Sequence, residues 1–234
     1  METEMTNRHV TIEPAILYFG TPVVLISTIN EDGSDNLAPM SSAFWLGWRC
    51  MLGLSALSKT SENIRRTGEC VLNLPSVDNV AAVNKLARTT GSNPVPPSKV
   101  QRGYRYERHK FEVAGLTSIP SETISALRVS ECPVQLEAIL CGRHPLGNDE
   151  PLLRGRTNVF EMRIQRVHAD PAIMVAGEPN RIDPSKWRPL IMSFQQFYGL
   201  TENQIHNSTL AEISESFYRS PDVDRARNVE KGNP

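Results

Sequence analysis

The sequence predicts a mostly β protein, an antiparallel barrel with helices at its periphery. Short apolar runs rich in β-branched residues recur along the chain, and clusters of Gly, Pro, Asn and Asp separate them, which is typical of antiparallel strands joined by turns. Few segments show the helical period. With 234 residues, 39% of them hydrophobic and 22% charged, the chain is long and apolar enough to bury one sizeable core. No internal repeat and no long linker divides it.

The first predicted element is a hairpin over residues 22–42. Residues 22–29 are almost continuously apolar, which predicts a strand buried on both faces. Asp32-Gly33 is the signal of a tight hairpin turn. The return strand, 36–42, contains Pro39, which has no N–H for the ladder, so we expect it at a sheet edge or a bulge. Backbone N–H groups freed there can face a ligand.

A second strand, Cys50–Leu57, is predicted to run into a helix over 58–66 that Gly68 ends, with Thr60 as its N-cap. The N-terminus of a helix presents unpaired N–H groups and the positive end of the helix dipole. Hydroxyl groups and the Lys59 ammonium gather at this point, so the segment predicts an anion pocket that suits a phosphate. The alternative is a simple helix cap.

The later elements follow from the same signals. The pattern predicts a strand at Glu69–Pro75, a helix at Asp78–Ala87 capped by Ser76 or Asp78, and a loop through Tyr106. Strands are predicted at Ile124–Ser130, Val134–Leu140 and Leu152–Arg166, the last two joined by a connection at Gly142–Glu150. A helical turn from Asp183-Pro184 and a helix at Thr209–Tyr218 are predicted before a charged tail.

Charge and composition exclude several kinds of partner. The 25 basic and 26 acidic residues give a net charge of −1 without long like-charge blocks, so neither nucleic acid nor an anionic membrane is an expected partner. Met1–Val10 is polar, and no stretch approaches 18 uninterrupted apolar residues. We therefore expect a cytoplasmic protein with no membrane partner.

The cysteines and histidines do not form a metal motif. Cys50, Cys70, Cys132 and Cys141 are far apart and form no CxxC pair, so we expect buried apolar thiols. A set of Cys132, Cys141 and His144 lacks a fourth ligand at a typical spacing, and no metal site is predicted. The Gly-x-Gly-x-x-Gly fingerprint and a Ser/His/Asp constellation are also missing.

A set of short motifs carries a family resemblance. These are Ser27-Thr28, Asn36–Ser41, Thr60–Ile64, Thr67–Glu69, Asn73-Leu74, Lys110-Phe111, Ala114–Thr117, Cys132–Glu137, Val167–Asp170 and Arg181–Asp183. In order and spacing the set resembles the flavin-reductase-like FMN-binding proteins, a split β-barrel family that includes flavoredoxin and the reductase partners of two-component monooxygenases. The resemblance covers residues 10–200, which we expect to form the FMN-binding domain. Residues 201–234, a C-terminal helix and charged tail, have no counterpart, and the proline-rich segment 88–106 is longer than expected.

The resemblance implies two groups of flavin ligands and two further candidates. The group expected at the pyrimidine edge of the ring is Asn36, Ala38, Pro39, Met40, Ser41 and Ser42, with backbone N–H groups from Ala38 to Ser42. The group expected at the phosphate is Ser55, Ala56, Ser58, Lys59, Thr60 and Asn63. His168 and Phe197 are candidates beside the flavin, although each also suits an ordinary core or surface position. His168 is the only candidate for a catalytic side chain, because FMN itself carries the chemistry.

The implied function is an FMN-dependent NAD(P)H:flavin oxidoreductase in which a hydride passes from NADH or NADPH to FMN. The implied partners are a second copy of the chain in a homodimer, the nicotinamide nucleotide, and a monooxygenase or other electron acceptor. The apolar Phe44–Trp48 segment next to the ring motif supports the dimer. Two alternatives stay open, a flavoredoxin-type electron-transfer flavoprotein and a noncatalytic split-barrel protein that binds flavin or haem.

Overall fold

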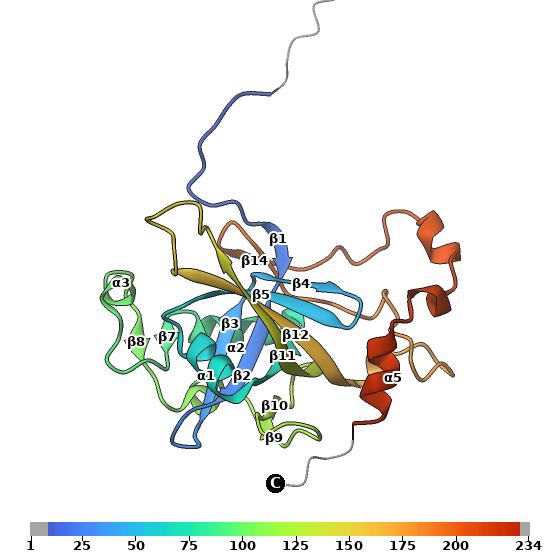
Figure 1. Cartoon of the computed structure of the whole chain (residues 1–234). Helices are drawn as coiled ribbons and strands as arrows, with labels where there is room; N and C mark the ends of the chain where they lie inside the picture. The colour runs from blue at the N-terminus through green and yellow to red at the C-terminus, as the bar shows by residue number, and fades with distance from the viewer. Residues whose placement is uncertain (1–8, 230–234) are drawn as a thin grey trace, which may run out of the picture.

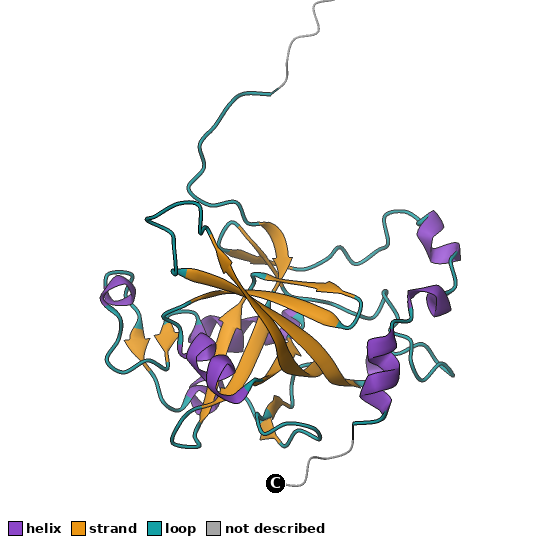
Figure 2. Cartoon of the chain, viewed as in Figure 1, coloured by secondary structure: helices purple, strands orange, loops and turns teal. Residues whose placement is uncertain are grey.

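The computed structural model describes residues 9–229 and has a seven-stranded antiparallel sheet at its centre (Figure 1). Residues 1–8 and 230–234, which hold most of the polar N-terminal segment and the end of the charged tail, lie outside the described residues. The strands lie in the order β3 (Asp35–Met40), β2 (Val24–Ile29), β6 (Glu69–Leu74), β11 (Val134–Leu146), β12 (Thr157–Ala169), β5 (Arg49–Ser55) and β4 (Ala43–Leu46). Figure 2 shows the helices around this sheet, so the prediction of a mostly β protein with peripheral helices is confirmed.

The sheet curls into a barrel that does not close. Its two edge strands, β3 and β4, follow one another in the chain and are joined by Ser41 and Ser42 alone. The backbone N–H of Gly53 donates a 2.8 Å hydrogen bond to the Ser42 carbonyl, which fixes this link against β5. The expected split β-barrel is therefore confirmed, and Pro39 lies in an edge strand as predicted.

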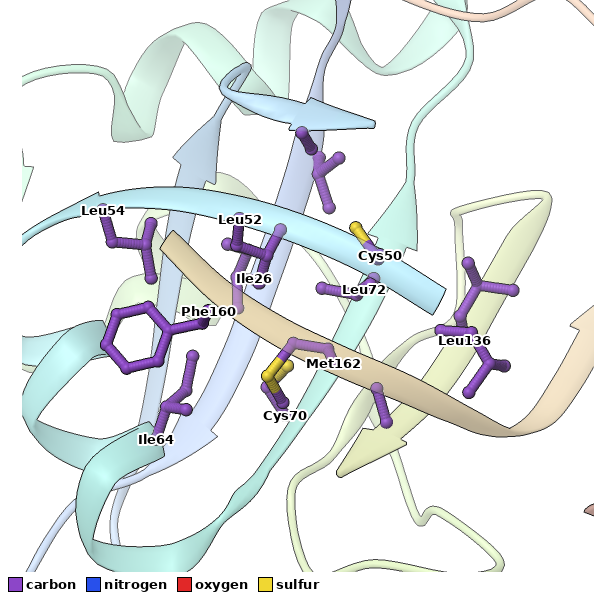
Figure 3. Close-up of a cluster of buried hydrophobic side chains, with 14 of the residues drawn as sticks. Ile26, Cys50, Leu52, Leu54, Ile64, Cys70, Leu72, Leu136, Phe160 and Met162 are labelled. Carbon is purple, nitrogen blue, oxygen red and sulfur yellow. The ribbon is translucent and has the colours of Figure 1, made fainter. Parts of the chain in front are cut away.

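One face of the curled sheet surrounds the main core (Figure 3). Alternate residues of a strand point to the same face. Ile26 of β2, Leu52 of β5 and Phe160 of β12 are fully buried on this face. Each side chain of this kind contributes roughly 1.5–3 kcal/mol on burial.

The opposite face of β2 is covered by helices. Leu25 belongs to a second buried cluster with Val83 of α2 (Val80–Leu86) and Ala114 of α4 (Lys110–Ala114). Because both faces of β2 are buried, its sequence is continuously apolar rather than alternating. This confirms the expectation for residues 22–29, although the structure divides them between β1 (Phe19–Pro22) and β2.

The helix that follows β5 is α1 (Lys59–Thr67), and its N-cap prediction was wrong by two residues. Ser58 is the N-cap, because its Oγ accepts a 3.1 Å hydrogen bond from the Ser61 backbone N–H. Thr60 lies inside the first turn. Gly68 ends the helix in the left-handed conformation, as predicted. Before α2, a 3₁₀ turn, η1 (Val77–Asn79), is capped by Ser76.

The predicted strand Ile124–Ser130 is the main error. Only β10 (Arg128–Val129) forms there, paired with β9 (Ser118–Ile119) outside the main sheet. The backbone N–H groups of the preceding turn, at Glu122 and Thr123, donate to the Glu137 carboxylate instead of to a strand. The boundaries of the two long strands also differ, since β11 continues into the predicted connection as far as Leu146 and β12 starts only at Thr157, after turns.

The remaining elements lie at the periphery. They are β7 (Thr89–Thr90), α3 (Pro97–Val100) and β8 (Arg105–Tyr106) within segment 88–106, then η2 (Pro171–Ile173), β13 (Ile191–Ser193), β14 (Gln196–Tyr198), η3 (Thr209–Glu212), η4 (Glu215–Tyr218) and α5 (Pro221–Arg227). The helix predicted at 209–218 is thus two 3₁₀ turns, because Ile213 between them is extended. Part of the expected charged tail is α5, held by a 2.9 Å ion pair between Arg49 and Asp222. Within residues 9–229 no helix is long and apolar enough to cross a membrane.

Candidate functional site

A buried hydrogen-bond network joins the start of α1 to β2 and β3. Asn36 Nδ2 donates to Thr28 Oγ1 at 3.2 Å and to Thr60 Oγ1 at 3.3 Å. Asn63 Nδ2 donates to Thr28 Oγ1 at 3.0 Å and to Asn30 Oδ1 at 2.9 Å. Asn36, expected at the ring, and Thr60 and Asn63, expected at the phosphate, therefore meet in one cluster.

Lys110 adds a buried cation to this network. Its side chain comes from α4, the residue is 3% exposed, and Nζ donates a 3.1 Å hydrogen bond to Asn36 Oδ1. Burial, reinforced by the nearby charge of Lys99 and opposed by Glu107, lowers the pKa of Lys110 to about 7. Among the described residues none forms an ion pair with Lys110. The Lys110 side chain is thus buried without an ion-pair partner among residues 9–229.

Segment 88–106 lies directly on the network. A Cβ on Gly91 would lie 2.6 Å from Asn36 Oδ1 and 3.1 Å from Lys59 Cγ, so the backbone approaches too closely for any larger residue. Lys99 of the same segment donates a 3.0 Å hydrogen bond from Nζ to Thr90 Oγ1. The long segment that sets this chain apart in sequence is therefore part of the site.

Two adjoining cavities open beside Lys59. The larger, about 520 Å³, is lined by Glu31, Ala56, Leu57, Ser58, Lys59, Glu62, Arg65, Ser92, Asn93, Pro94 and Pro96. The smaller, about 230 Å³, is lined by Asn30, Glu31, Asp32, Ser34, Lys59, Gly91, Asn93 and Tyr106. Lys59 itself forms a 2.7 Å ion pair with Glu62. Ala56, Ser58 and Lys59 of the predicted phosphate group thus line a cavity of ligand size.

The donors at this place suit a phosphate. Lys59 and Lys110 are cationic, Thr60 carries a hydroxyl group, and the first backbone N–H groups of α1 point out of the helix. Charge-assisted hydrogen bonds to phosphate oxygens are among the stronger ones in proteins. A phosphate dianion would supply the ion-pair partner that Lys110 lacks within residues 9–229, so the residues present fit the phosphate of FMN.

The other predicted ligands border the split of the barrel. Ala38, Pro39 and Met40 end β3, and Ser41 and Ser42 form the link to β4. Ser55 ends β5, and its carbonyl accepts a 2.7 Å hydrogen bond from Ser61 Oγ. The Ser58 hydroxyl is already used in capping α1. The chain from 36 to 42 and the chain from 55 to 63 are held together by the contact of Asn36 with Thr60.

The structure does not bring His168 and Phe197 to this place. His168 lies near the C-terminal end of β12, whereas Thr157, which pairs with Ser55, lies at the other end of the strand. The Nε2 atom of His168 is 2.8 Å from Glu137 Oε1. Burial acts to raise the pKa of Glu137, but hydrogen bonds from His168, Thr123 and two backbone N–H groups lower it to about 2. Phe197 packs against the second buried cluster, on the outer face of β2.

Lys110, Asn30 and Gly91 belong to the site but are not among the flavin ligands expected from the sequence, although Lys110 is part of one resembling motif. For Lys110 a signal was present, because Lys110 and the buried Ala114 are four residues apart on one face of α4. A lysine on the buried face of a short helix points to a functional cation. Asn30 and Gly91 carry no comparable local signal.

Comparison with known proteins identifies the family. The model of the flavin reductase like domain matches residues 16–201. The uncharacterized protein YdfE of Bacillus subtilis is 38% identical over 195 residues, 83% of this chain and 91% of its own length. Two solved structures share the fold. Nitrilotriacetate monooxygenase component B from Bacillus cereus has a TM-score of 0.65 at 23% identity and covers 85% of this chain and 99% of its own. Flavoredoxin of Desulfovibrio vulgaris (Miyazaki F) has a TM-score of 0.64 at 20% identity and covers 90% and 100%. The chain therefore belongs to the flavin reductase like family.

Proposed function

We propose that this protein is an FMN-dependent NAD(P)H:flavin oxidoreductase. The observation that carries the proposal is the cluster of Lys110, Asn36 and Thr60 at the start of α1. A buried ammonium group without an acidic partner is costly unless a ligand supplies the charge. Membership of the flavin reductase like family makes a flavin phosphate the ligand of choice.

Different residues bind the phosphate and the ring of FMN. Lys59, Thr60 and Lys110 hold the phosphate, and Asn36 orients the Lys110 ammonium through its Oδ1. The backbone N–H groups and hydroxyl groups from Ala38 to Ser42 pair with the edge of the ring. When bound, FMN supplies the acceptor for a hydride from NADH or NADPH. The protein contributes position and exclusion of water rather than a side-chain acid or base.

The same proposal includes a homodimer in the cytoplasm. Phe44 and Leu46 on the edge strand β4 are 54% and 71% exposed, and Phe19 on β1 is 73% exposed. Apolar side chains gathered in this way favour a second protein surface over water. The described cysteines are all free thiols, which suits a reducing compartment. The similarity to a monooxygenase component supports a monooxygenase as the electron acceptor.

A flavoredoxin-type electron carrier is the second candidate. The observation that favours it is the position of Gly91 over Asn36 and Lys59, because a segment closed over the flavin site would hinder a nicotinamide nucleotide. Such a protein would keep its FMN and exchange electrons with another protein.

Steady-state oxidation of NADH and of NADPH, with and without added FMN, tests the proposal. The reductase consumes the nucleotide in proportion to added protein, and Lys110→Met raises the FMN concentration needed for half-maximal rate. Lys85→Met, at an exposed lysine of α2, is the matched control. A purified yellow protein that consumes neither nucleotide would favour the carrier.

A further inference from the structure

The chain between residues 203 and 219 forms an arm that projects from the barrel. Figure 1 shows it in orange and red, running outwards after β14 and returning to α5. Both ends of the arm are attached to the body. Arg188 donates 2.9 Å and 3.2 Å hydrogen bonds to the two carbonyl groups just before the arm, and Asp222, just after it, forms the ion pair with Arg49.

The arm carries large apolar side chains that stay exposed within the described chain. Ile205 is 88% exposed, Leu210 66% and Phe217 83%. None of the three belongs to either buried cluster. An exposed ion pair of Glu215 with Arg181, at 3.1 Å, ties the arm to the body, but a pair of this kind contributes little stability. Apolar side chains gathered in this number indicate a surface that another protein covers.

Two short capped turns give the arm a defined shape. The Ser208 and Ser214 hydroxyl groups accept hydrogen bonds from the backbone N–H groups of Leu210 and Ser216, and so cap η3 and η4. Flexible linkers are rich in glycine, whereas no glycine occurs between residues 203 and 219. Turns this short are marginal without tertiary contacts. The arm therefore has the character of a docking segment rather than a linker.

The same chain exposes an apolar surface next to the base of the arm. Phe44 and Leu46 on the edge strand β4 are exposed, so the arm leaves them uncovered in its own chain. The arm nevertheless ends beside this strand, since a Cβ on Gly47 would lie 3.9 Å from the Ser220 side chain. In two copies related by a two-fold axis, each arm can lie on the β4 edge of the other copy, and every contact then occurs twice.

We propose that the arm, residues 203–219, packs against the β4 edge of a second copy of this chain and that this reciprocal contact holds the homodimer together. The inference rests on the homodimer proposed above and adds the segment that forms it. A second copy is the occupant because one chain supplies both uncovered surfaces. The arm alone provides most of the roughly 20–30 residues that each partner contributes to a stable interface. The match to the family model ends at residue 201, so the arm lies outside the matched domain.

Light scattering at micromolar concentration tests the proposal with two double variants of the arm. Leu210→Asp with Phe217→Asp should raise the Kd of the dimer at least about a hundredfold, because each dimer would bury the added charges twice. Asn203→Asp with Asn207→Asp is the matched control, since it adds the same charge to the arm at exposed polar positions. The control should keep a mass of twice 26.1 kDa. Circular dichroism checks that both variants are folded.

Mixing two monomeric variants tests the reciprocal contact. The arm variant keeps its β4 edge, and Phe44→Glu with Leu46→Glu keeps its arm, so each should be a monomer alone. In an equimolar mixture the intact arm of the edge variant can pack on the intact edge of the arm variant. A heterodimer with one of the two contacts should therefore form. An arm that packs on the β4 edge of its own copy predicts no such recovery.

Two results would overturn the proposal. One is a folded arm variant that dimerises as tightly as wild type, and the other is a mixture of the two folded variants that stays monomeric up to millimolar concentration. A monomeric wild type would overturn the homodimer and this inference together. None of these masses depends on flavin chemistry, so the proposed oxidoreductase stands or falls separately, on the oxidation of NADH and NADPH.

Discussion

The Lys110 ammonium donates a hydrogen bond to Asn36 Oδ1 across 74 positions of sequence, at 3.1 Å. Both residues are almost completely buried. Asn36 in turn contacts Thr60 at the start of α1, so one amide connects the cation of α4 to the helix that is expected to hold the flavin phosphate. A buried cation without an ion-pair partner lowers the stability of the folded protein until an anionic ligand binds.

The first prediction is that Lys110→Met stabilises the ligand-free protein and weakens FMN binding. Removing a buried unpaired charge should raise the free energy of unfolding by about 1–3 kcal/mol. Losing the charge-assisted hydrogen bonds should raise the Kd for FMN about tenfold to a hundredfold. Thermal unfolding and flavin titration measure the two effects, with Lys85→Met as control. If the variant binds FMN as tightly as wild type, Lys110 does not contact the ligand.

The second prediction is that FMN binding takes up a proton above pH 7. The pKa of Lys110 is about 7 in the ligand-free protein, and a bound phosphate dianion raises it. Between the pKa of the free protein and that of the complex, Lys110 is less protonated in the free protein than in the complex. The affinity for FMN therefore falls as pH rises, by up to about tenfold per pH unit. Titrations from pH 6.5 to 9 measure this slope. Riboflavin should show no slope, and a flat FMN profile in wild type would contradict the prediction.

The same pKa fixes the pH dependence of the ligand-free protein. The folded pKa of Lys110 lies below the ordinary lysine value of 10.5. The unfolded chain therefore binds more proton between about pH 7 and 10.5, and stability rises with pH through this window. The advantage of Lys110→Met should accordingly be greatest at or below pH 7 and shrink towards pH 10.

The third prediction concerns Lys59 and Thr60. The double variant Lys59→Ala with Thr60→Ala should raise the Kd for FMN several-fold to about a hundredfold, because charged hydrogen bonds contribute roughly 1.5–3 kcal/mol each. Riboflavin lacks the phosphate, so its Kd should hardly change. Equal FMN affinity in the folded double variant would place the phosphate elsewhere.

Features that depend on residues close in sequence could be predicted, whereas features that depend on contacts between distant parts of the chain could not. The buried strand at residues 22–29, the edge position of Pro39 and the helix end at Gly68 depend on local pattern and backbone preference, and all three were predicted correctly. The error at Ile124–Ser130 has a distant cause, because the N–H groups of its preceding turn bind the Glu137 carboxylate.

The candidate site divides in the same way. The hydroxyl groups and lysine at the start of α1 were visible as a local motif. Which hydroxyl caps the helix depended on the conformation of one residue, Ser58, and was missed. The local spacing of α4 could mark Lys110 as a buried lysine, but its contact with Asn36 depends on the packing of α4 against β3, which no local pattern shows.

The fourth prediction is that the native unit is a dimer. Light scattering at micromolar concentration should give twice the chain mass of 26.1 kDa. The exposed Phe44 and Leu46 of β4 are the expected contact, so Phe44→Glu with Leu46→Glu should shift the protein towards monomer. A clean wild-type monomer with full FMN binding would contradict the dimer.

The most direct test of the central claim is anaerobic stopped-flow absorbance of flavin-loaded protein mixed with NADH or NADPH. The account predicts loss of the oxidised flavin band with at least one nucleotide, and return of the band on admission of oxygen. Bleaching by dithionite with no response to either nucleotide at millimolar concentration would contradict the reductase and favour the electron carrier.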